Sequence, residues 1–311
     1  MAGAAALRLS TDPVFLVGAA RSGTSLLYRV LALHPAATYL SNWVQRFPQL
    51  PELVALNRLA RAMPQTRHRM WFGPKGDEAY VYGERRSAFR RAFPNPAEAE
   101  GFYRQSGVPE NGHDAPTLSR AASEELRRRV RRVARADGHR ALLMKRIANN
   151  RRLPLLAELF PGARFIEIVR DGRAVAASIA RVDWWEGSTV WWWGGTPADW
   201  RAAGRDPWEL CARNWTEEVA ITRTGLAGLD ADRVLSIRYE DLVAAPDSVV
   251  RTCAAFAGMS PTDTKWTSAL SDVRFPDNNQ RWRSALPTDA LTTIERVQAA
   301  ELQRYGYLLA S

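Results

Sequence analysis

A strand–turn–helix unit at residues 14–35 constrains this chain more than any other stretch. The apolar segment Val14 to Val17 has the composition of a strand that is buried on both faces of a sheet. A turn of small residues, Gly18 to Ser25, follows it, and residues 26–33 carry apolar side chains at helical spacing. Such a turn points backbone N–H groups and the positive end of a helix at one place. The unit therefore predicts an anion site, most often one for phosphate.

The turn is related to a Walker loop but departs from it at one position. Gly18 and Gly23 have the spacing of the two Walker glycines, whereas Thr24 stands where that loop carries its lysine. The turn therefore predicts a phosphate ligand that needs no lysine at the terminal groups of a nucleoside triphosphate. A divergent nucleotide kinase or other P-loop NTPase is the alternative reading, and Thr24 argues against it.

Strand and helix patterns alternate along the remaining chain. Further buried-strand patterns occur at residues 141–144, 164–169 and 233–239, and helical patterns lie between and after them. We expect an α/β fold of three layers, P-loop NTPase-like, with a central parallel β-sheet flanked by helices. Residues 1–311 are expected to form one domain, with a variable insert at about 38–116 over the ligand-binding edge.

Cysteine usage and apolar runs bear on location and metal content. Cys211 and Cys253 are the only cysteines, which are too few for a disulfide framework and lack zinc-site spacing, so no metal is expected. The N-terminal residues do not show a signal-peptide pattern, and no run of 18 apolar residues occurs. We expect a cytoplasmic protein.

One motif resembles a loop of a known enzyme family. The sequence RSGTSLL at residues 21–27, with His34-Pro35 after it, resembles the 5′-phosphosulfate loop of sulfotransferases. The resemblance implies 3′-phosphoadenosine 5′-phosphosulfate (PAPS) as the co-substrate, a donor that has no γ-phosphate. It implies that Arg21 supplies charge at the sulfate. The residues that would bind the 5′-phosphate with the turn's N–H groups are Ser22, Gly23, Thr24 and Ser25.

A second motif strengthens the resemblance. The sequence IVRDGR at residues 168–173, with Ser178 eight positions beyond Arg170, is similar to the strand and helix that bind the 3′-phosphate in sulfotransferases. Its Arg-Asp-Gly-Arg sequence is especially similar to the corresponding motif of tyrosylprotein sulfotransferases and related single-domain bacterial enzymes. The resemblance implies that Arg170 and Ser178 hold the 3′-phosphate, and that Tyr239 and Arg281 are further cofactor contacts.

The catalytic residues follow from the resemblance only in part. Lys145, at the end of its strand, matches a lysine that stabilises the leaving group, with Arg21 beside the sulfate. The glutamate that tyrosylprotein sulfotransferases carry beyond the His-Pro pair is replaced by Asn42, which cannot accept a proton. His113, followed by Asp114 in a loop rich in glycine and proline, is our candidate base. Other side chains with suitable chemistry are His68, Asp77, Glu78, Glu84 and Glu186.

Tryptophan is concentrated where the acceptor is expected. Eight of the twelve tryptophans lie between Trp184 and Trp215. We expect Trp208 and Trp215 in the core, whereas the segment 184–200 either lines an acceptor pocket or packs inside. Consecutive tryptophans such as those at 191–193 cannot all point inward. The expected acceptor is a small molecule, a lipid or a glycan with a hydroxyl or amine group.

The net charge suggests one further reading. A formal charge of +10, and a helical pattern at 118–136 that is dense in arginine, suit an acidic partner. A basic protein that binds nucleic acid or an anionic membrane surface is therefore a third hypothesis, but it leaves both phosphate motifs unexplained. We interpret the arginines as a solvated face and expect no nucleic-acid partner. A peripheral membrane contact and the oligomeric state stay open.

Overall fold

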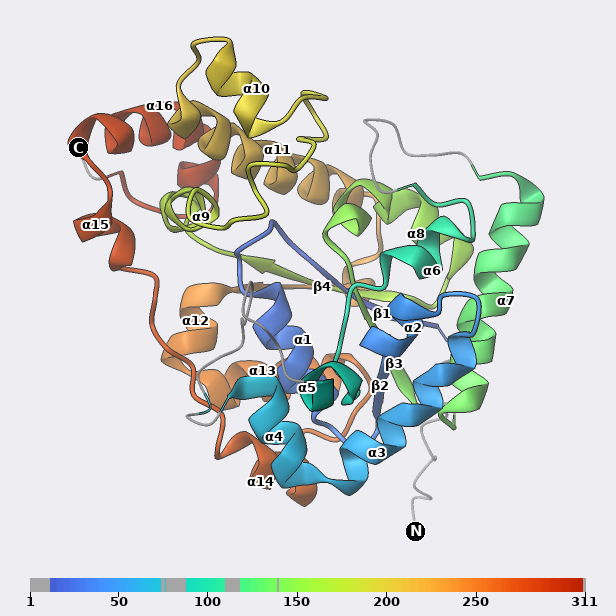
Figure 1. Cartoon of the computed structure of the whole chain (residues 1–311). Helices are drawn as coiled ribbons and strands as arrows, with labels where there is room; N and C mark the ends of the chain where they lie inside the picture. The colour runs from blue at the N-terminus through green and yellow to red at the C-terminus, as the bar shows by residue number, and fades with distance from the viewer. Residues whose placement is uncertain (1–11, 74–75, 77–87, 110–117, 139, 310–311) are drawn as a thin grey trace.

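The computed structural model describes residues 12–73, 76, 88–109, 118–138 and 140–309 (Figure 1). Within them, one five-stranded sheet has the spatial order β2-β3-β1-β4-β5, and every pairing is parallel. The strands are β1 (Val14–Val17), β2 (Ala37–Tyr39), β3 (Ala141–Lys145), β4 (Arg164–Val169) and β5 (Val234–Arg238). The predicted α/β fold with a central parallel sheet is confirmed.

Alternate residues of the central strands pack into two different helical layers, as the period of two in a strand requires. Leu16 and Ile166 belong to a core built with α1 (Thr24–Ala32) and α13 (Pro246–Phe256). Phe15 and Phe165 belong to the opposite core, and their rings stack at 5.4 Å. The helices in contact with that second core are α7 (Arg120–Ala136), α8 (Leu153–Leu159) and α6 (Glu100–Arg104).

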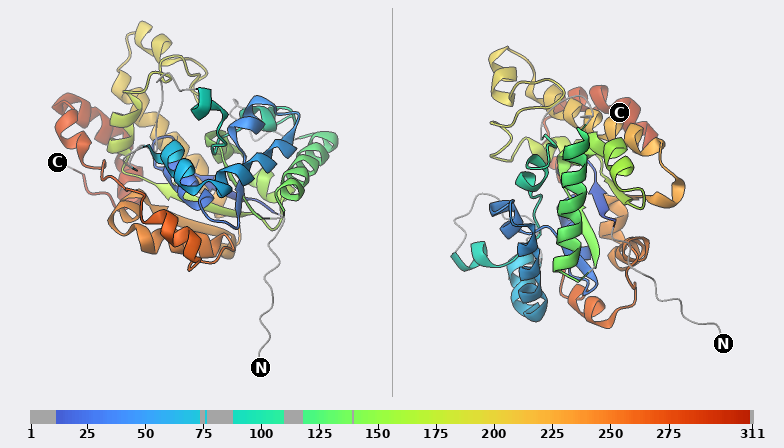
Figure 2. Two further views of the ribbon diagram at one scale, coloured as in Figure 1. Left: turned by 60° about the horizontal axis from the view of Figure 1, so that its bottom comes forward. Right: turned by 90° about the vertical axis from the view of Figure 1, so that its right-hand side faces the viewer.

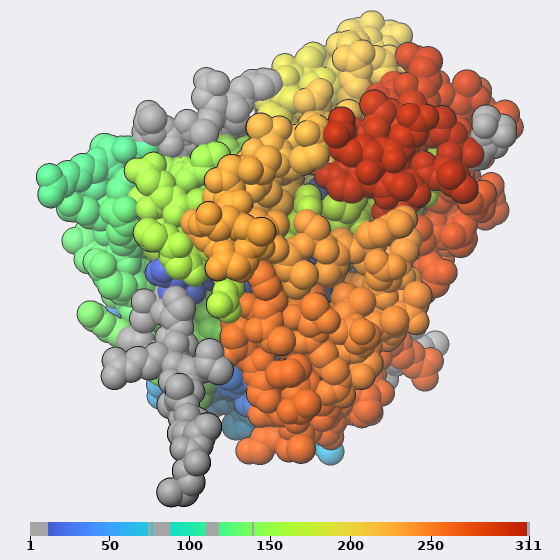
Figure 3. All heavy atoms as spheres, turned by 180° about the vertical axis from the view of Figure 1, so that it is seen from behind, coloured from blue at the N-terminus to red at the C-terminus, as the bar shows by residue number. Residues whose placement is uncertain are grey.

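Three helices lie together beyond the carboxyl ends of β1 and β4. They are α9 (Gly172–Ile179), α11 (Pro207–Ala227) and α16 (Thr288–Arg304). Trp215 is fully buried between them, as predicted, whereas Trp208 is partly buried. The reverse side of the molecule in Figure 3 shows α16 (red) next to the segment around α11 (gold). These helices position the second phosphate motif.

The segment expected as an insert begins inside the sheet, because β2 forms its edge strand. After Tyr39 the chain forms short helices, and these gather on the same side of the molecule as the yellow segment that carries α10 (Pro197–Ala202) (Figure 2). They are α2 (Asn42–Arg46), η1 (Pro51–Leu56), α3 (Asn57–Ala62), α4 (Pro64–Phe72) and α5 (Ala88–Ala92). Short elements such as β2 have too few residues for a clear sequence period.

The remaining elements include one difference from expectation, because the arginine face of α7 is not wholly solvated. The segment 275–286 contains the short helix α15 (Arg281–Ala285). Arg129 is buried, with its guanidinium 4.9 Å from the centroid of the Phe102 ring. Its long apolar stem and planar head allow this burial. The other helices are α12 (Tyr239–Ala244) and α14 (Thr264–Leu270), with 3₁₀ turns η2 (Ile147–Arg152) and η3 (Ala231–Arg233).

None of the helices in the described part of the chain is long and apolar enough to cross a membrane. Across the same residues, no group of three histidine, cysteine, aspartate or glutamate side chains is arranged to hold a metal ion.

Candidate functional site

The turn between β1 and α1 is shaped to leave its N–H groups accessible. Arg21 and Gly23 both have positive φ, 70° and 94°, and no side chain caps the N-terminus of α1. A Cβ at Gly23 would lie 2.6 Å from Cδ2 of Tyr239, so only glycine fits there. Ser22 is fully buried, and its Oγ has no hydrogen-bond partner among the described residues. The uncapped helix end and this orphaned hydroxyl suit an anionic ligand.

An asparagine that the sequence analysis did not single out holds the turn from behind. Asn150 Oδ1 accepts from Gly18 N at 3.0 Å, and its Nδ2 donates to Gly18 O at 3.0 Å and to Glu218 Oε2 at 2.7 Å. Glu218 is buried, and burial raises its pKa while Arg151, whose Nη1 lies 3.3 Å from Glu218 Oε1, acts in the opposite direction. This network fixes the start of the turn.

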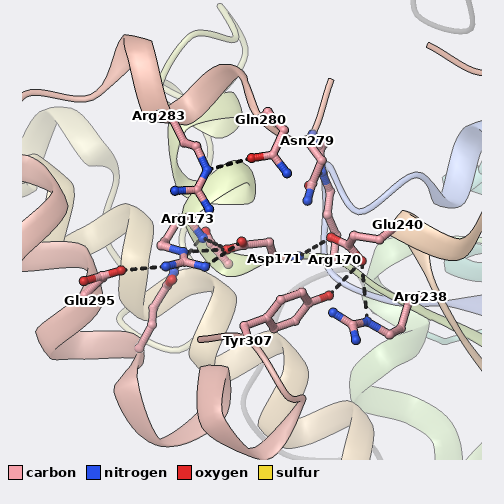
Figure 4. Close-up of polar contacts among 12 residues, drawn as sticks. Arg170, Asp171, Arg173, Arg238, Glu240, Asn279, Gln280, Arg283, Glu295 and Tyr307 are labelled. Atoms are coloured by element: carbon pink, nitrogen blue, oxygen red, sulfur yellow. Dashed lines mark hydrogen bonds and ion pairs between the residues drawn. The ribbon is translucent and has the colours of Figure 1, made fainter. Parts of the chain in front are cut away.

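The second motif lies where β4 ends (Figure 4). Asp171 caps α9 by accepting from Arg173 N at 2.9 Å, and it also accepts from Arg173 Nε at 3.0 Å. Arg173 donates in turn to Glu295 Oε1 at 2.6 Å. The second arginine of the RDGR sequence is therefore structural, and it ties α9 to α16.

Arg170 points to the other side, toward the turn. Its Nη1 donates to Arg21 O at 2.9 Å, its Nε donates to Asn279 Oδ1 at 3.0 Å, and its guanidinium lies 4.3 Å from the centroid of the Tyr239 ring. Arg21 Nε donates to Ser178 Oγ at 3.0 Å. The predicted phosphate residues Arg21, Arg170, Ser178 and Tyr239 thus meet in one place. Arg281 is exposed at the start of α15 and is not part of this group.

Lys145 lies at the end of β3 in an ion pair that the sequence did not reveal. It is buried, and its Nζ contacts Glu98 Oε1. Glu98 Oε2 accepts from Ile147 N at 3.1 Å, so the carboxylate is oriented from two sides. The Glu98 side chain is 40% exposed and therefore accessible to a bound molecule. Lys145 lies 47 positions after Glu98 in the sequence, and no motif around Glu98 marks it.

A cavity of about 810 Å³ lies between the phosphate turn and the Lys145–Glu98 ion pair. Its polar side includes Arg21, Thr24, Ser25, Lys145 and Glu98, and its apolar side includes Trp184, Trp185 and Trp191. The other tryptophans of this segment pack internally. The rings of Trp192 and Trp193 lie edge-on to Trp200, at 6.1 and 4.9 Å. The tryptophan segment therefore serves both the cavity and the core.

Of the remaining candidate bases, the two that the structure describes, His68 and Glu186, do not line this cavity. His68 Nε2 is 3.0 Å from the carbonyl oxygen of Asp272, and Glu186 is exposed in an ion pair with Arg201. Asn42 has a structural role, because its Oδ1 accepts from Asn95 N at 2.9 Å. The predicted residues that lie outside the described part of the chain are Asp77, Glu78, Glu84, His113 and Asp114.

Comparison with known proteins identifies a family and a shared fold. A family model described as the sulfotransferase family matches residues 13–263. The sulfotransferase STF9 from Mycobacterium avium matches at 17% identity and a TM-score of 0.59, over 96% of this chain and 78% of that chain. STF1 from Mycobacterium tuberculosis H37Rv matches at 20% identity and a TM-score of 0.54, over 93% and 75% of the two chains. The sulfotransferase domain from the curacin biosynthetic pathway matches at 15% identity and 0.52, over 96% and 98%. No curated protein matches the chain.

Proposed function

The chain belongs to the sulfotransferase family, and we propose that its cavity of about 810 Å³ brings PAPS and a small acceptor together at Lys145 and Glu98. The observation that carries the proposal is the Lys145–Glu98 ion pair beside the phosphate turn. A cation for the leaving group and a carboxylate for the acceptor proton are then supplied by two contacting side chains. Lys145 and Glu98, the side chains proposed for these two roles, both line the same cavity.

The residues of the turn fit the 5′ end of the donor. The uncapped N–H groups of α1, together with Ser22, Thr24 and Ser25, would hold the 5′-phosphate, and Arg21 would lie near the sulfate. When bound, PAPS supplies the sulfuryl group that is transferred. Thr24 in place of the Walker lysine suits a donor without a γ-phosphate.

Specificity for the 3′-phosphate would come from the second motif. Arg170 is buried and fixed by hydrogen bonds, and Ser178 is partly exposed on α9 next to Arg21. We assign the 3′-phosphate contact to these two side chains, with Tyr239 packed against both Arg170 and Gly23. Arg281, exposed on α15, is a further proposed contact.

The proposed chemistry divides between the members of the ion pair. Lys145 donates a hydrogen bond to the bridging oxygen of the leaving phosphate and so stabilises the charge that develops there. Glu98 accepts the proton of the acceptor hydroxyl. We give it the role that the sequence analysis gave to His113, which lies outside the described residues, because Glu98 contacts Lys145.

The size and lining of the cavity favour a small acceptor with an apolar or aromatic body. Pockets for small molecules measure roughly 300–1,000 Å³. Trp184, Trp185 and Trp191 provide flat apolar surfaces that a ring or chain would pack against. A lipid or glycan presents its hydroxyl on a larger body and is the second choice. The cytoplasmic location and the peripheral membrane contact stay predictions.

Binding and turnover test this function separately. Titration with 3′,5′-adenosine bisphosphate in the presence of a chelator is expected to raise the melting temperature. Incubation with radiolabelled PAPS and a panel of phenols, alcohols and amines then identifies the acceptor. Stabilisation by ATP with magnesium, and none by the bisphosphate, would contradict the proposal.

A further inference from the structure

A second cavity, of about 550 Å³, lies between α4 and α14. It shares no lining residue with the first cavity. Leu33, which lines it, follows the last residue of α1, whereas Thr24 at the first residue of α1 lines the other cavity. The nine-residue helix separates the two sites by about 14 Å at a rise of about 1.5 Å per residue. The second cavity is thus distinct from the proposed active site.

Its most unusual lining residue is Arg67. The side chain is 95% buried, since its exposed fraction is 5%, and its guanidinium carbon lies 5.6 Å from the Trp71 ring. Among the described residues, the buried Arg67 Nε has no hydrogen-bond partner, and no ion pair to Arg67 is present. Burial, with a smaller contribution from neighbouring Arg61, lowers its pKa. Buried charges are normally paired, because desolvation is costly.

Among the residues that the structure describes, the surroundings of Arg67 have fewer carboxylates than arginines. Asp137 is fully buried and is shared by three of them. Arg61 Nη1 donates to Asp137 Oδ2 at 2.8 Å, and the closest ion-pair distances from Arg58 and Arg140 are 3.7 and 3.8 Å. Arg67 is a fourth arginine in this region. Burial raises the pKa of the neighbouring Tyr39 hydroxyl, and Arg67 is near enough to act in the opposite direction. The described side chains behind the cavity therefore carry more positive than negative charge.

Further polar side chains line the second cavity. Lys265 and His68 also line the cavity, and Asp272 is its acidic lining residue. The Asp272 backbone carbonyl contacts His68 Nε2 at 3.0 Å, which connects α4 to the chain after α14. Leu33, Pro35 and Pro64 provide an apolar part. A compact ligand with one anionic head matches this lining.

We propose that this second cavity binds a small anion whose carboxylate, phosphate or sulfate group pairs with Arg67. A guanidinium offers parallel N–H donors that match the oxygens of such groups. The ligand removes the cost of an unpaired buried charge and so stabilises the fold around α4. The inference does not depend on the sulfotransferase site.

The test measures melting temperature with the phosphate turn already filled. The full chain is saturated with 3′,5′-adenosine bisphosphate, and inorganic phosphate, citrate or sodium chloride is then added at equal ionic strength. Phosphate or citrate, at tenfold excess over its dissociation constant, is expected to raise the wild-type melting temperature by about 3 °C relative to chloride. The anion that acts distinguishes a phosphate ligand from a carboxylate.

Two substitutions on one helix provide the comparison. Arg67→Met is expected to abolish the shift without lowering the starting melting temperature, whereas exposed Arg69→Met retains the shift. If Arg67→Met does not fold, Lys265→Met is measured, and a reduced shift is expected. An absent wild-type shift, or a shift unchanged in Arg67→Met or Lys265→Met, overturns the proposal.

Discussion

Arg21 Nε donates a hydrogen bond of 3.0 Å to Ser178 Oγ, although 157 positions separate the two residues. The carbonyl oxygen of the same arginine accepts from Arg170 Nη1 at 2.9 Å. Arg21 therefore joins the turn after β1 to the strand end and helix of the second motif. A ligand with two separate phosphate groups would contact one continuous set of donors. A nucleoside triphosphate carries its phosphates in a single chain and does not match this arrangement.

Ser178→Ala tests this arrangement. Loss of the hydroxyl removes one proposed donor to the 3′-phosphate, and a hydrogen bond to a charged group contributes about 1.5–3 kcal/mol. We expect affinity for 3′,5′-adenosine bisphosphate to fall about tenfold or more, measured by isothermal titration calorimetry. Ser248→Ala, at an exposed position of α13, is the matched control. Equal loss of affinity for adenosine 5′-phosphate would contradict a role at the 3′ group.

Glu98→Gln tests the proposed base. Glutamine preserves the shape and accepts from Ile147 N, but it cannot take up a proton in turnover. We expect kcat to fall about 10²- to 10⁴-fold with an alcohol acceptor, with binding of the bisphosphate little changed. The loss is expected to be smaller with 4-nitrophenol, which gives up its own proton readily. Glu186→Gln, at an exposed ion pair, is the control, and equal losses with both acceptors would refute the role.

Lys145→Ala tests the other member of the pair. The substitution removes the cation proposed for the leaving group, so we expect a lower kcat and a smaller change in bisphosphate affinity. The ion pair with Glu98 is also lost, so the melting temperature is measured alongside the rate. Full turnover in this variant would show that Lys145 has a different role.

Gly23→Ala tests the shape of the turn. Alanine at φ 94° costs about 1–2 kcal/mol, and its Cβ would lie 2.6 Å from Tyr239. We expect the melting temperature to fall by about 4 °C or more and bisphosphate affinity to fall with it. Gly228→Ala is the control, because φ is −87° there and no atom lies within 4 Å of the added Cβ. Similar shifts in the two variants would contradict the steric argument.

The sequence predicted the parts of the site that depend on local patterns. The turn after Val17 and the end of the strand at Val169 follow from apolar runs, small residues and motif spacing. Parallel pairing of β1 with β4 then requires these two strand ends to be neighbours, as the sheet confirms. Most of the predicted cofactor residues came from these two motifs, whereas Tyr239 and Arg281 lie outside them.

The acceptor side depends on contacts between residues that are distant in sequence. Glu98 contacts Lys145, which lies 47 positions later in the sequence, and Asn150 contacts Gly18, which lies 132 positions earlier. No periodic pattern around Glu98 or Asn150 indicates these contacts. Arg67 likewise becomes unusual only when burial is known. Local composition does not reveal these contacts, because they form only when the segments after β2 and β3 pack against distant parts of the chain.

Glu167 provides a prediction about stability and pH. It is buried in β4 and accepts from Ser236 Oγ at 2.6 Å. Burial raises its pKa, and the hydrogen bond from Ser236 acts in the opposite direction. The unfolded chain therefore loses this proton first as the pH rises, from its ordinary pKa of about 4.3, so the carboxyl group lowers folding stability above that range.

Glu167→Gln removes this pH-dependent cost while keeping an acceptor for Ser236. We expect the variant to gain stability relative to the wild type as the pH rises above about 4.3, and the gain to level off above the folded-state pKa of Glu167. Urea denaturation at pH 4 and at pH 8 measures the difference between the two proteins at each pH. Glu217→Gln, at the exposed surface of α11, is the control and is expected to show no such change. A relative gain that is larger at pH 4 than at pH 8 would reverse the sign and exclude burial as the dominant effect on Glu167.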